Sequence, residues 1–381
     1  MRHLALVIPT IDRIGGAERQ VLLLAKGLAQ RGWRVSLIAL SGTGSKFAAE
    51  LSSAGIAYHS LQMRRGLADP RGWIRFNRWL RHHNPDILHA HLPHAVWLAR
   101  WSRLFAPACA VVDTIHTSAT GTWGRKLGYR FSDRLSDTVT AVSDSVADAY
   151  TSAHMVSSHH LAVLPNGVDT ETWQPDPSAR DTVDRELGLT DEFLWLAAGR
   201  LERVKDYPTL LRAFGSISAP ARLVIAGAGP DEAALRLLAR DLGVESRVQF
   251  LGFVPDVRRW LQAADGFVLS SLWEGLPMSI LEASACAVPS VAVDVPGTHE
   301  TILHGQTGLL AEPGSVDALA VAMTRMMNFA PQSRQLLGQR ARQFVVDRFS
   351  LNSVLDRWET LYAELLDRAS VSAVSTSPRQ A

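Results

Sequence analysis

The feature that most constrains the fold is an alternation of short apolar runs with amphipathic helical patterns, present in both halves of the chain. The strand-like runs are Leu4–Ile8, Val35–Leu40, Ile87–Ala90, Val111–Ile115 and Thr138–Val142, then Leu194–Ala198, Leu223–Ala226, Val248–Leu251, Gly266–Leu269 and Ser290–Val293. Helical patterns such as Ala17–Gln30 and Asp231–Leu242 separate them. Continuous apolar strands separated by helices predict parallel sheets covered on both faces. We therefore expect an α/β protein with two tandem Rossmann-like domains.

The length of the chain, 381 residues, suits two domains. Val168–Arg185, rich in Asp, Thr and Pro, is interpreted as the linker. We expect an N-terminal domain over residues 1–167, a C-terminal domain over 168–348, a helix over 349–366 that returns to the N-terminal domain, and a disordered tail over 367–381. Ligands bind at the carboxyl ends of strands in such sheets, so the site is expected in a cleft where the strand ends of the two domains face each other.

Composition excludes several classes of function. A formal net charge of +2 argues against a nucleic-acid partner. Cys109 and Cys286 lie far apart in small or apolar surroundings, which favours free thiols in a reducing compartment. No Cys/His spacing suggests a metal site, no apolar run is long enough to cross a bilayer, and the N-terminus enters a strand-like run directly. We expect a cytoplasmic protein.

Two carboxylates flank a predicted helix start. Glu274 lies in a glycine-containing loop, Pro277 suits the first turn of a helix that runs to about Ala285, and Glu282 lies inside that helix. The free N–H groups of a helix start attract anions, so this arrangement suits a polyol phosphate. One surface glutamate and one on a helix face is the alternative interpretation.

Three further positions follow predicted strands. Gly15 and Gly16 come after the first strand, where glycines let the backbone approach an anion. His116 ends the strand-like run VVDTIH and is placed for polar contact with a substrate. Arg200 and Lys205 lie past the first strand of the second half, where two cations would clamp a diphosphate. An ordinary turn, a core histidine and a solvated basic loop are the respective alternatives.

Several familiar motifs do not match. Gly227-Ala228-Gly229 follows a strand, but Glu232 occupies the place of the third glycine of a dinucleotide fingerprint. Gly42–Lys46 lacks the spacing of a phosphate-binding P-loop. No Asp-x-Asp pair suits Mg²⁺, so we expect a diphosphate to be neutralised without metal, and we expect no cofactor.

The glutamate pair, with seven residues between its members, resembles the E-x7-E motif of retaining glycosyltransferases of the GT-B architecture, and more narrowly family 4 of nucleotide-sugar-dependent transferases. The same family order holds for Gly15–Gly16, Leu164–Asp169, Gly199–Lys205, Gly227–Pro230, Leu251–Val254, Gly297–Glu300 and Thr307–Leu310. The resemblance covers about residues 3–365. One departure is Pro296–Glu300, where the family often has Gly-Gly-x-x-Glu.

The resemblance implies a role for each matched residue. Arg200 and Lys205 would hold the donor diphosphate, Glu282 the ribose, and Glu274 the transferred sugar. His116 would hydrogen-bond that sugar near its reacting carbon, and Gly16 would contact donor phosphate when the domains close. The remaining substrate-binding candidates are Gly15, Asn166, Leu251, Gly252, Phe253, Gly275, Leu276, Pro277, Met278, Ser279 and Ile280.

The resemblance also implies the reaction: metal-independent transfer from a UDP-linked sugar to a saccharide or lipid-linked saccharide in cell-surface polysaccharide biosynthesis, by front-face attack. A nucleotide-sugar epimerase and a non-catalytic nucleotide-sugar-binding protein are the alternatives.

Basic and aromatic residues alternate in Arg71–Arg81 and Trp97–Leu104, and a third set follows at Trp123–Arg130. They suggest peripheral contact with the inner face of the membrane. The alternative is aromatic faces packed on the sheet with solvated arginines, and we favour that alternative.

Overall fold

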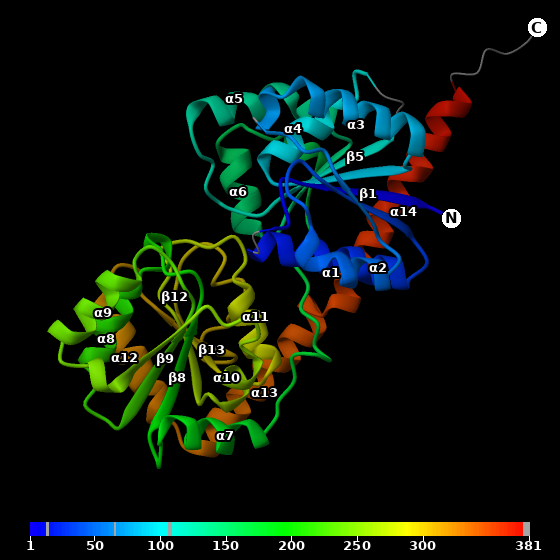
Figure 1. The fold of residues 1–381 in the computed structure, drawn as a ribbon. Coiled ribbons are helices and arrows are strands. Elements are labelled where there is room, and N and C mark those ends of the chain that lie inside the picture. Colours follow the sequence, from blue (N-terminus) through cyan, green and yellow to red (C-terminus); the bar gives the residue numbers. More distant parts are fainter. Residues whose placement is uncertain (13–14, 65, 106–108, 376–381) are drawn as a thin grey trace, which may run out of the picture. The chain divides into compact units, whose positions relative to one another are not determined.

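The computed structural model describes residues 1–12, 15–64, 66–105 and 109–375. The chain divides into two compact units (Figure 1): unit 1 is Met1–Gly167 with Leu351–Ala381, and unit 2 is Val168–Ser350. Each unit contains one parallel sheet with helices on its faces. The structure thus confirms the expected α/β class.

Unit 1 is built on a sheet that, within the described residues, has seven strands in the order β3-β2-β1-β4-β5-β6-β7. The strands are β1 (His3–Ile8), β2 (Arg34–Ala39), β3 (Ala57–Ser60), β4 (Ile87–His91), β5 (Ala110–Ile115), β6 (Thr138–Ala141) and β7 (Leu161–Val163). The helices are α1 (Gly16–Gln30), α2 (Ala48–Ser53), α3 (Pro70–His83), α4 (Pro93–Ser102), α5 (Trp123–Ser132), α6 (Asp144–Ser152) and α14 (Leu351–Ser375).

Helix α14 lies beside α1 and contributes to the core of unit 1. Gly27 allows this close approach, because a Cβ at that position would lie 2.5 Å from a methyl group of Leu355. Trp358 and Tyr362 are buried in the same core. The last helix of the chain is therefore an integral layer of the unit that contains the N-terminus.

Unit 2 has strands in the order β10-β9-β8-β11-β12-β13. They are β8 (Phe193–Ala198), β9 (Ala221–Ala226), β10 (Val248–Gly252), β11 (Gly266–Leu269), β12 (Ser290–Val293) and β13 (Gly308–Ala311). The helices are α7 (Ser178–Leu187), α8 (Tyr207–Gly215), α9 (Glu232–Asp241), α10 (Arg258–Ala263), α11 (Met278–Ala285), α12 (Val316–Met327) and α13 (Pro331–Phe349).

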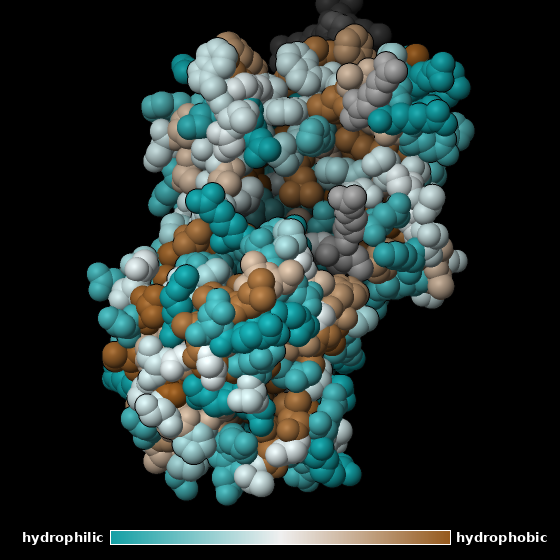
Figure 2. All heavy atoms as spheres, turned by 60° about the vertical axis from the view of Figure 1, so that its left-hand side comes forward, coloured by the Kyte–Doolittle hydropathy of each residue, from teal (hydrophilic) through white to brown (hydrophobic). Residues whose placement is uncertain are grey.

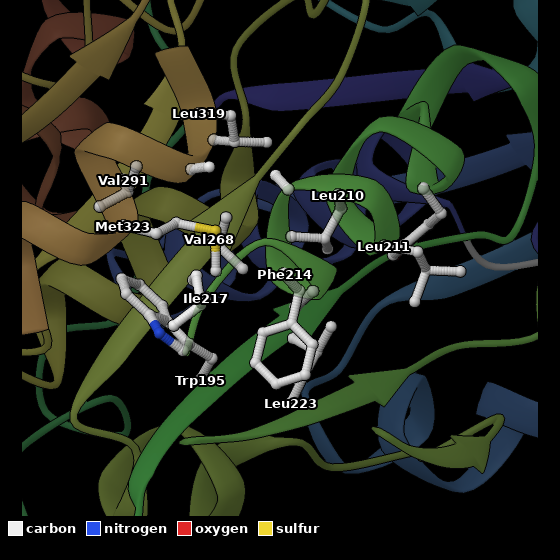
Figure 3. Close-up of a cluster of buried hydrophobic side chains, with 14 of the residues drawn as sticks. Trp195, Leu210, Leu211, Phe214, Ile217, Leu223, Val268, Val291, Leu319 and Met323 are labelled. Atoms are coloured by element: carbon white, nitrogen blue, oxygen red, sulfur yellow. The ribbon is translucent and has the colours of Figure 1, made fainter. Parts of the chain in front are cut away.

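Two apolar cores hold unit 2 together. Figure 3 shows part of one, in which Trp195 from β8 and Phe214 from α8 lie with Leu319 and Met323 from α12. A second cluster contains residues of α7, α10 and α11, including Trp260. Burial of apolar surface on both faces explains why the strands are continuous apolar runs without polar alternation.

Two boundary predictions are wrong. The expected linker Val168–Arg185 includes most of α7, whose Ala179 and Val183 are buried against the sheet despite the polar composition of the segment. The expected disordered tail from residue 367 is helical as far as Ser375, because a helix that is already formed is easily extended. Residues 376–381 lie outside the described residues.

In the parts of the chain that the structure describes, no helix is long and apolar enough to cross a membrane. Cys109 and Cys286 are both free thiols, and Cys286 is buried.

The strand order reverses direction between β1 and β4 in unit 1 and between β8 and β11 in unit 2. At such a switch point the loops after two adjacent strands diverge and leave a crevice at their carboxyl ends. The loops after these four strands are therefore the places to look for a site.

Candidate functional site

An ion pair lies at the switch point of unit 2. Lys205 Nζ donates to Glu274 Oε1 at 2.5 Å, and the two side chains are 17% and 13% exposed. Lys205 follows β8 and Glu274 follows β11, and these two strands are paired. The structure thus brings together two sequence-predicted residues that are separated by 69 positions.

The carboxylate of Glu274 is held by its own loop as well. Ser271 donates its hydroxyl to the same Oε1 atom at 2.6 Å, and Ser270 donates to the backbone oxygen of Lys205 at 2.8 Å. These two serines, which sequence reasoning missed, connect the loop that carries Glu274 to the loop that carries Lys205.

The Pro296–Glu300 segment supports Glu274 from the other side. Glu274 N donates to Pro296 O at 3.1 Å, and a Cβ on Gly297 would lie 2.8 Å from Gly275 O. Gly297 also has a φ of +88°, which favours glycine. The segment where this chain departs from the family pattern therefore packs against the backbone of the acid loop.

Glycines tie the ends of β8, β9 and β10 together. Gly227 N donates to Gly252 O at 2.8 Å, and a Cβ on Gly227 would lie 1.8 Å from Gly199 O. A Cβ on Gly229 would lie 2.1 Å from Leu201 O. The GAGP run thus serves close backbone packing beside the Lys205 loop.

Arg200 lies in the same loop but has a different partner. Its side chain is 72% exposed and contacts Glu202 Oε1 at 2.8 Å. In this structure Arg200 is thus a solvated cation at the rim, whereas Lys205 is largely enclosed.

Helix α11 places Glu282 in the interior. Glu282 is buried, and it contributes with desolvation to raising the pKa of the Cys286 thiol to about 12. Met278 begins the helix directly after Pro277, close to the expected start, and Ser279 and Ile280 complete the first turn. Gly275 and Leu276 precede it in the loop.

The other end of α11 is held by Arg342 of α13. Its guanidinium donates to the backbone oxygens of Ala285, Trp173 and Thr170. A cation at a helix C-terminus is favourable both as a cap and against the helix dipole. Arg342 was not singled out from the sequence.

The resemblance implies that Leu251, Gly252 and Phe253 meet the base of the nucleotide, largely through their backbone. Leu251 and Gly252 form the end of β10, and Phe253 follows it. Phe253 is 71% exposed. An exposed aromatic ring beside a strand end suits stacking, and its role stays a prediction.

At the switch point of unit 1, Gly15 has a partner in α1. Its N–H donates to Glu18 Oε2 at 2.9 Å, an acid in the first turn of α1. In this structure the carboxylate of Glu18 thus accepts the Gly15 N–H, and the expected contact of the Gly15–Gly16 pair with an anion stays a prediction. Gly16 begins α1, and among the described residues, its chain neighbours and the backbone of its own helix aside, no heavy atom lies within 4 Å of where its Cβ would be.

His116 follows β5 and lines a small cavity that is partly open to solvent. Asn166, another predicted residue, lines the same cavity, together with His91 and Trp358. His91 Nδ1 lies 3.0 Å from His116 Nε2. Burial lowers the pKa of His116 to about 4, so the ring is neutral near pH 7.

The wall of this cavity is fixed by Gln20 of α1. Its side-chain amide donates to Gly167 O at 2.9 Å and accepts from Gly167 N at 3.0 Å. A Cβ on Gly167 would lie 3.1 Å from the Cα of Leu351. The Asn166 segment is thus held against both α1 and the start of α14.

Comparison with known families identifies the chain. Residues 14–172 match the model described as Glycosyltransferase Family 4, and residues 179–344 match Glycosyl transferases group 1. The chain belongs to this family of GT-B glycosyltransferases and is a glycosyltransferase.

Individual relatives agree with this assignment. The chain is 32% identical over 321 residues to a GDP-mannose-dependent α-(1-6)-phosphatidylinositol monomannoside mannosyltransferase of Mycobacterium tuberculosis, covering 79% of this chain and 80% of the relative. It is 28% identical over 292 residues to N-acetyl-α-D-glucosaminyl L-malate synthase of Bacillus anthracis, covering 74% and 76%.

The fold is similar to that of HepE from Anabaena, solved in complex with UDP and glucose, with a TM-score of 0.84 at 20% identity, over 95% of this chain and all of that one. This likeness shows the fold.

Proposed function

We propose that the protein is a retaining, metal-independent glycosyltransferase that transfers a sugar from a UDP-linked donor to a saccharide or lipid-linked saccharide in cell-surface polysaccharide biosynthesis. The observation that carries the proposal is the enclosed Lys205–Glu274 pair at the switch point of unit 2, beside the loop that leads into α11. The reaction class is supported by the similarity to a GDP-mannose-dependent phosphatidylinositol monomannoside mannosyltransferase and to HepE, which was solved with UDP and glucose.

The pair supplies opposite groups for a nucleotide sugar. A lysine ammonium has three N–H donors, so Lys205 has donors beyond its bond to Glu274 with which to contact phosphate oxygens. The Glu274 carboxylate accepts hydrogen bonds, as sugar hydroxyls require. Arg200 at the rim and the start of α11 add positive potential for the diphosphate. This charge set supports a site that needs no metal.

The same contacts favour front-face transfer. A carboxylate bonded to both an ammonium and a hydroxyl is a weak nucleophile, so Glu274 suits hydroxyl binding better than covalent attack. The bond between the anomeric carbon and the phosphate oxygen breaks while the acceptor oxygen bonds to the same face of that carbon. The acceptor's proton passes to the departing phosphate. The protein orients both reactants and stabilises the charge on the diphosphate.

A thermal-shift screen of UDP- and GDP-sugars, each with and without EDTA, tests the proposal. A donor at 100 times its Kd adds about 2.7 kcal/mol of stability, which for a domain of this size corresponds to a rise in Tm of roughly 5–10 °C. We expect that rise with one UDP-sugar and no change with EDTA. A rise in Tm with GDP-sugars alone contradicts the UDP donor, and loss of the rise in EDTA contradicts metal independence. Retention is checked separately by analysis of the product, and an inverted anomeric configuration contradicts it.

Peripheral membrane contact is part of the proposal, and we assign this contact to a surface other than that of α3. Phe76 and Trp79 of α3 are buried, as the packing alternative for that helix predicts. Ile74 of α3 is 59% exposed, but a larger set of exposed apolar residues lies at the end of α4 and on α5, two helices in contact. These residues are Trp101, Leu104, Phe105, Trp123 and Phe131. Trp123 and Phe131 are 75% and 73% exposed.

Basic residues accompany this apolar set. Arg130 and Arg134 are exposed on and just after α5, and Arg81 of α3 donates to Phe105 O at 2.6 Å. Figure 2 shows one face of the molecule, on which hydrophobic and hydrophilic residues are interspersed. Aromatic side chains beside arginines suit the interface of an anionic bilayer. We propose an anionic membrane surface as the partner of the α4–α5 surface.

Sedimentation with vesicles tests this contact. We expect binding to vesicles rich in phosphatidylglycerol and about tenfold weaker binding to phosphatidylcholine vesicles. Trp123→Ser with Phe131→Ser should weaken binding to the anionic vesicles by about tenfold. The matched control is Leu237→Ser with Val321→Ser, which removes two exposed apolar residues from unit 2. Equal binding by both double variants contradicts the proposal.

A further inference from the structure

Three histidines cluster toward the carboxyl ends of two neighbouring interior strands of the unit 1 sheet, β4 and β5. His89 and His91 point to the same face of β4, and His116 follows β5, the next strand. The ring centroids of His89 and His91 are 4.1 Å apart, and those of His91 and His116 are 5.3 Å apart. The proposed function uses His116 alone, and the other two rings have no role in it so far.

The protonation of His89 follows from its neighbours. Thr140 Oγ1 donates to Asp113 O at 3.0 Å, so it accepts from Thr114 Oγ1 at 2.7 Å. The Thr114 proton is then used, and Thr114 accepts from His89 Nε2 at 2.6 Å.

The other nitrogen of His89 therefore accepts, and its partner at 2.7 Å is the hydroxyl of Tyr362. A backbone oxygen at the end of the chain of hydrogen bonds thus fixes His89 as the neutral Nε2–H tautomer.

The tautomers of His91 and His116 are not fixed by their neighbours, unlike that of His89. One proton lies between His91 Nδ1 and His116 Nε2, and either ring can supply it. The outer nitrogens, His91 Nε2 and His116 Nδ1, are buried and have no hydrogen-bond partner among the residues that the structure describes. His91 is 2% exposed, and both rings line the cavity described above.

The shared proton couples the two outer nitrogens. If His91 donates, both rings are Nδ1–H tautomers, so His116 presents a donor and His91 an acceptor. If His116 donates, both rings are Nε2–H tautomers and the two outer roles exchange. Burial lowers the pKa of both rings, which keeps the pair neutral near pH 7. The donor or acceptor character of His116 is therefore coupled to that of His91.

We propose that His91 is a positioning residue for sugar transfer, which holds the ring orientation of His116 and couples the tautomer of His116 to its own through the Nδ1–Nε2 hydrogen bond. The inference rests on the proposed function, because it deepens the role of His116 there. His91 itself acts through His116.

Tautomer measurement tests the pairing without any activity. Long-range ¹H–¹⁵N correlation spectra of the full chain at pH 7, with His91→Asn and His116→Asn used for assignment, report which nitrogen of each ring carries the proton. We expect matched tautomers for His91 and His116 and an Nε2–H tautomer for His89. One Nδ1–H and one Nε2–H ring in the His91–His116 pair overturns the inference.

Kinetics test the positioning role. His91→Leu removes the hydrogen bond, and we expect kcat to fall about tenfold with the donor KM within about twofold. His91→Asn places an amide near Nδ1 and should restore most of kcat, whereas a merely structural role gives no such rescue. His94→Leu, at an exposed position on α4, is the matched control. An unchanged kcat in His91→Leu overturns the inference, and an unchanged kcat in His116→Ala instead contradicts the proposed role of His116.

Discussion

Replacing Lys205 with methionine should lower kcat/KM for the nucleotide sugar by about 10²- to 10³-fold, the usual effect of removing one donor that stabilises developing charge in an enclosed site. The Lys205 side chain is largely enclosed and meets Glu274 at 2.5 Å. Methionine keeps the length of the side chain and removes the charge. Initial rates at varied donor concentration, with Tm recorded in parallel, give the measurement.

Stability and catalysis can be separated with a second change. Lys205→Met leaves Glu274 without its counter-charge, which destabilises an enclosed pair. The double variant with Glu274→Gln removes both charges and should regain Tm without regaining activity. Lys26→Met, which breaks a more exposed 2.7 Å pair with Glu50, should keep activity within about twofold. A Lys205→Met enzyme with more than a third of the wild-type kcat/KM would refute the site.

Glu282→Gln should weaken binding of the free nucleoside diphosphate by about 10- to 100-fold, the range expected for hydrogen bonds to a charged group. Glu282 is buried within α11, and glutamine preserves its volume. Isothermal titration with UDP alone, without the sugar, isolates the ribose contact that the family resemblance implies.

Glu274→Gln provides the contrast within the same site. If Glu274 holds the sugar, its replacement leaves the affinity for UDP within about threefold and weakens the UDP-sugar. Glu245→Gln, at an exposed residue in contact with Arg240, controls for loss of one carboxylate from unit 2. Wild-type affinity for UDP in Glu282→Gln contradicts the ribose assignment.

Ten of the thirteen described strands could be predicted from the sequence, and three could not. The ten predicted strand-like runs coincide with observed strands to within a residue or two, because strands covered on both faces must be apolar throughout. The edge strands β3 and β7 escaped prediction because their residues are at most half-buried. The edge strand β13 is mostly buried, and its residues were noted only as part of a family motif. Helix α7 was hidden by its polar face, since few of its residues enter the core.

The site was predictable residue by residue but not as a set of contacts. Glu274, Glu282 and Lys205 stood out by type and position, yet nothing in linear spacing shows that Lys205 meets Glu274. The strand order contains that information, because the first and fourth strands of such a sheet are neighbours. Ser271 gave no signal, and Gly297 stood out only as part of a family motif, since the contacts that both make form only in the folded chain.

The three hydrogen bonds from Arg342 to backbone oxygens have a consequence for the interpretation of natural variants of this sequence. One side chain on α13 braces both the end of α11 and the segment that contains Thr170 and Trp173. A substitution of Arg342 would remove the cap at the end of α11, the helix that carries Glu282, and would leave the proposed ligand-binding residues unchanged. Such an allele would be scored as harmless by inspection of the motif and as inactive by assay.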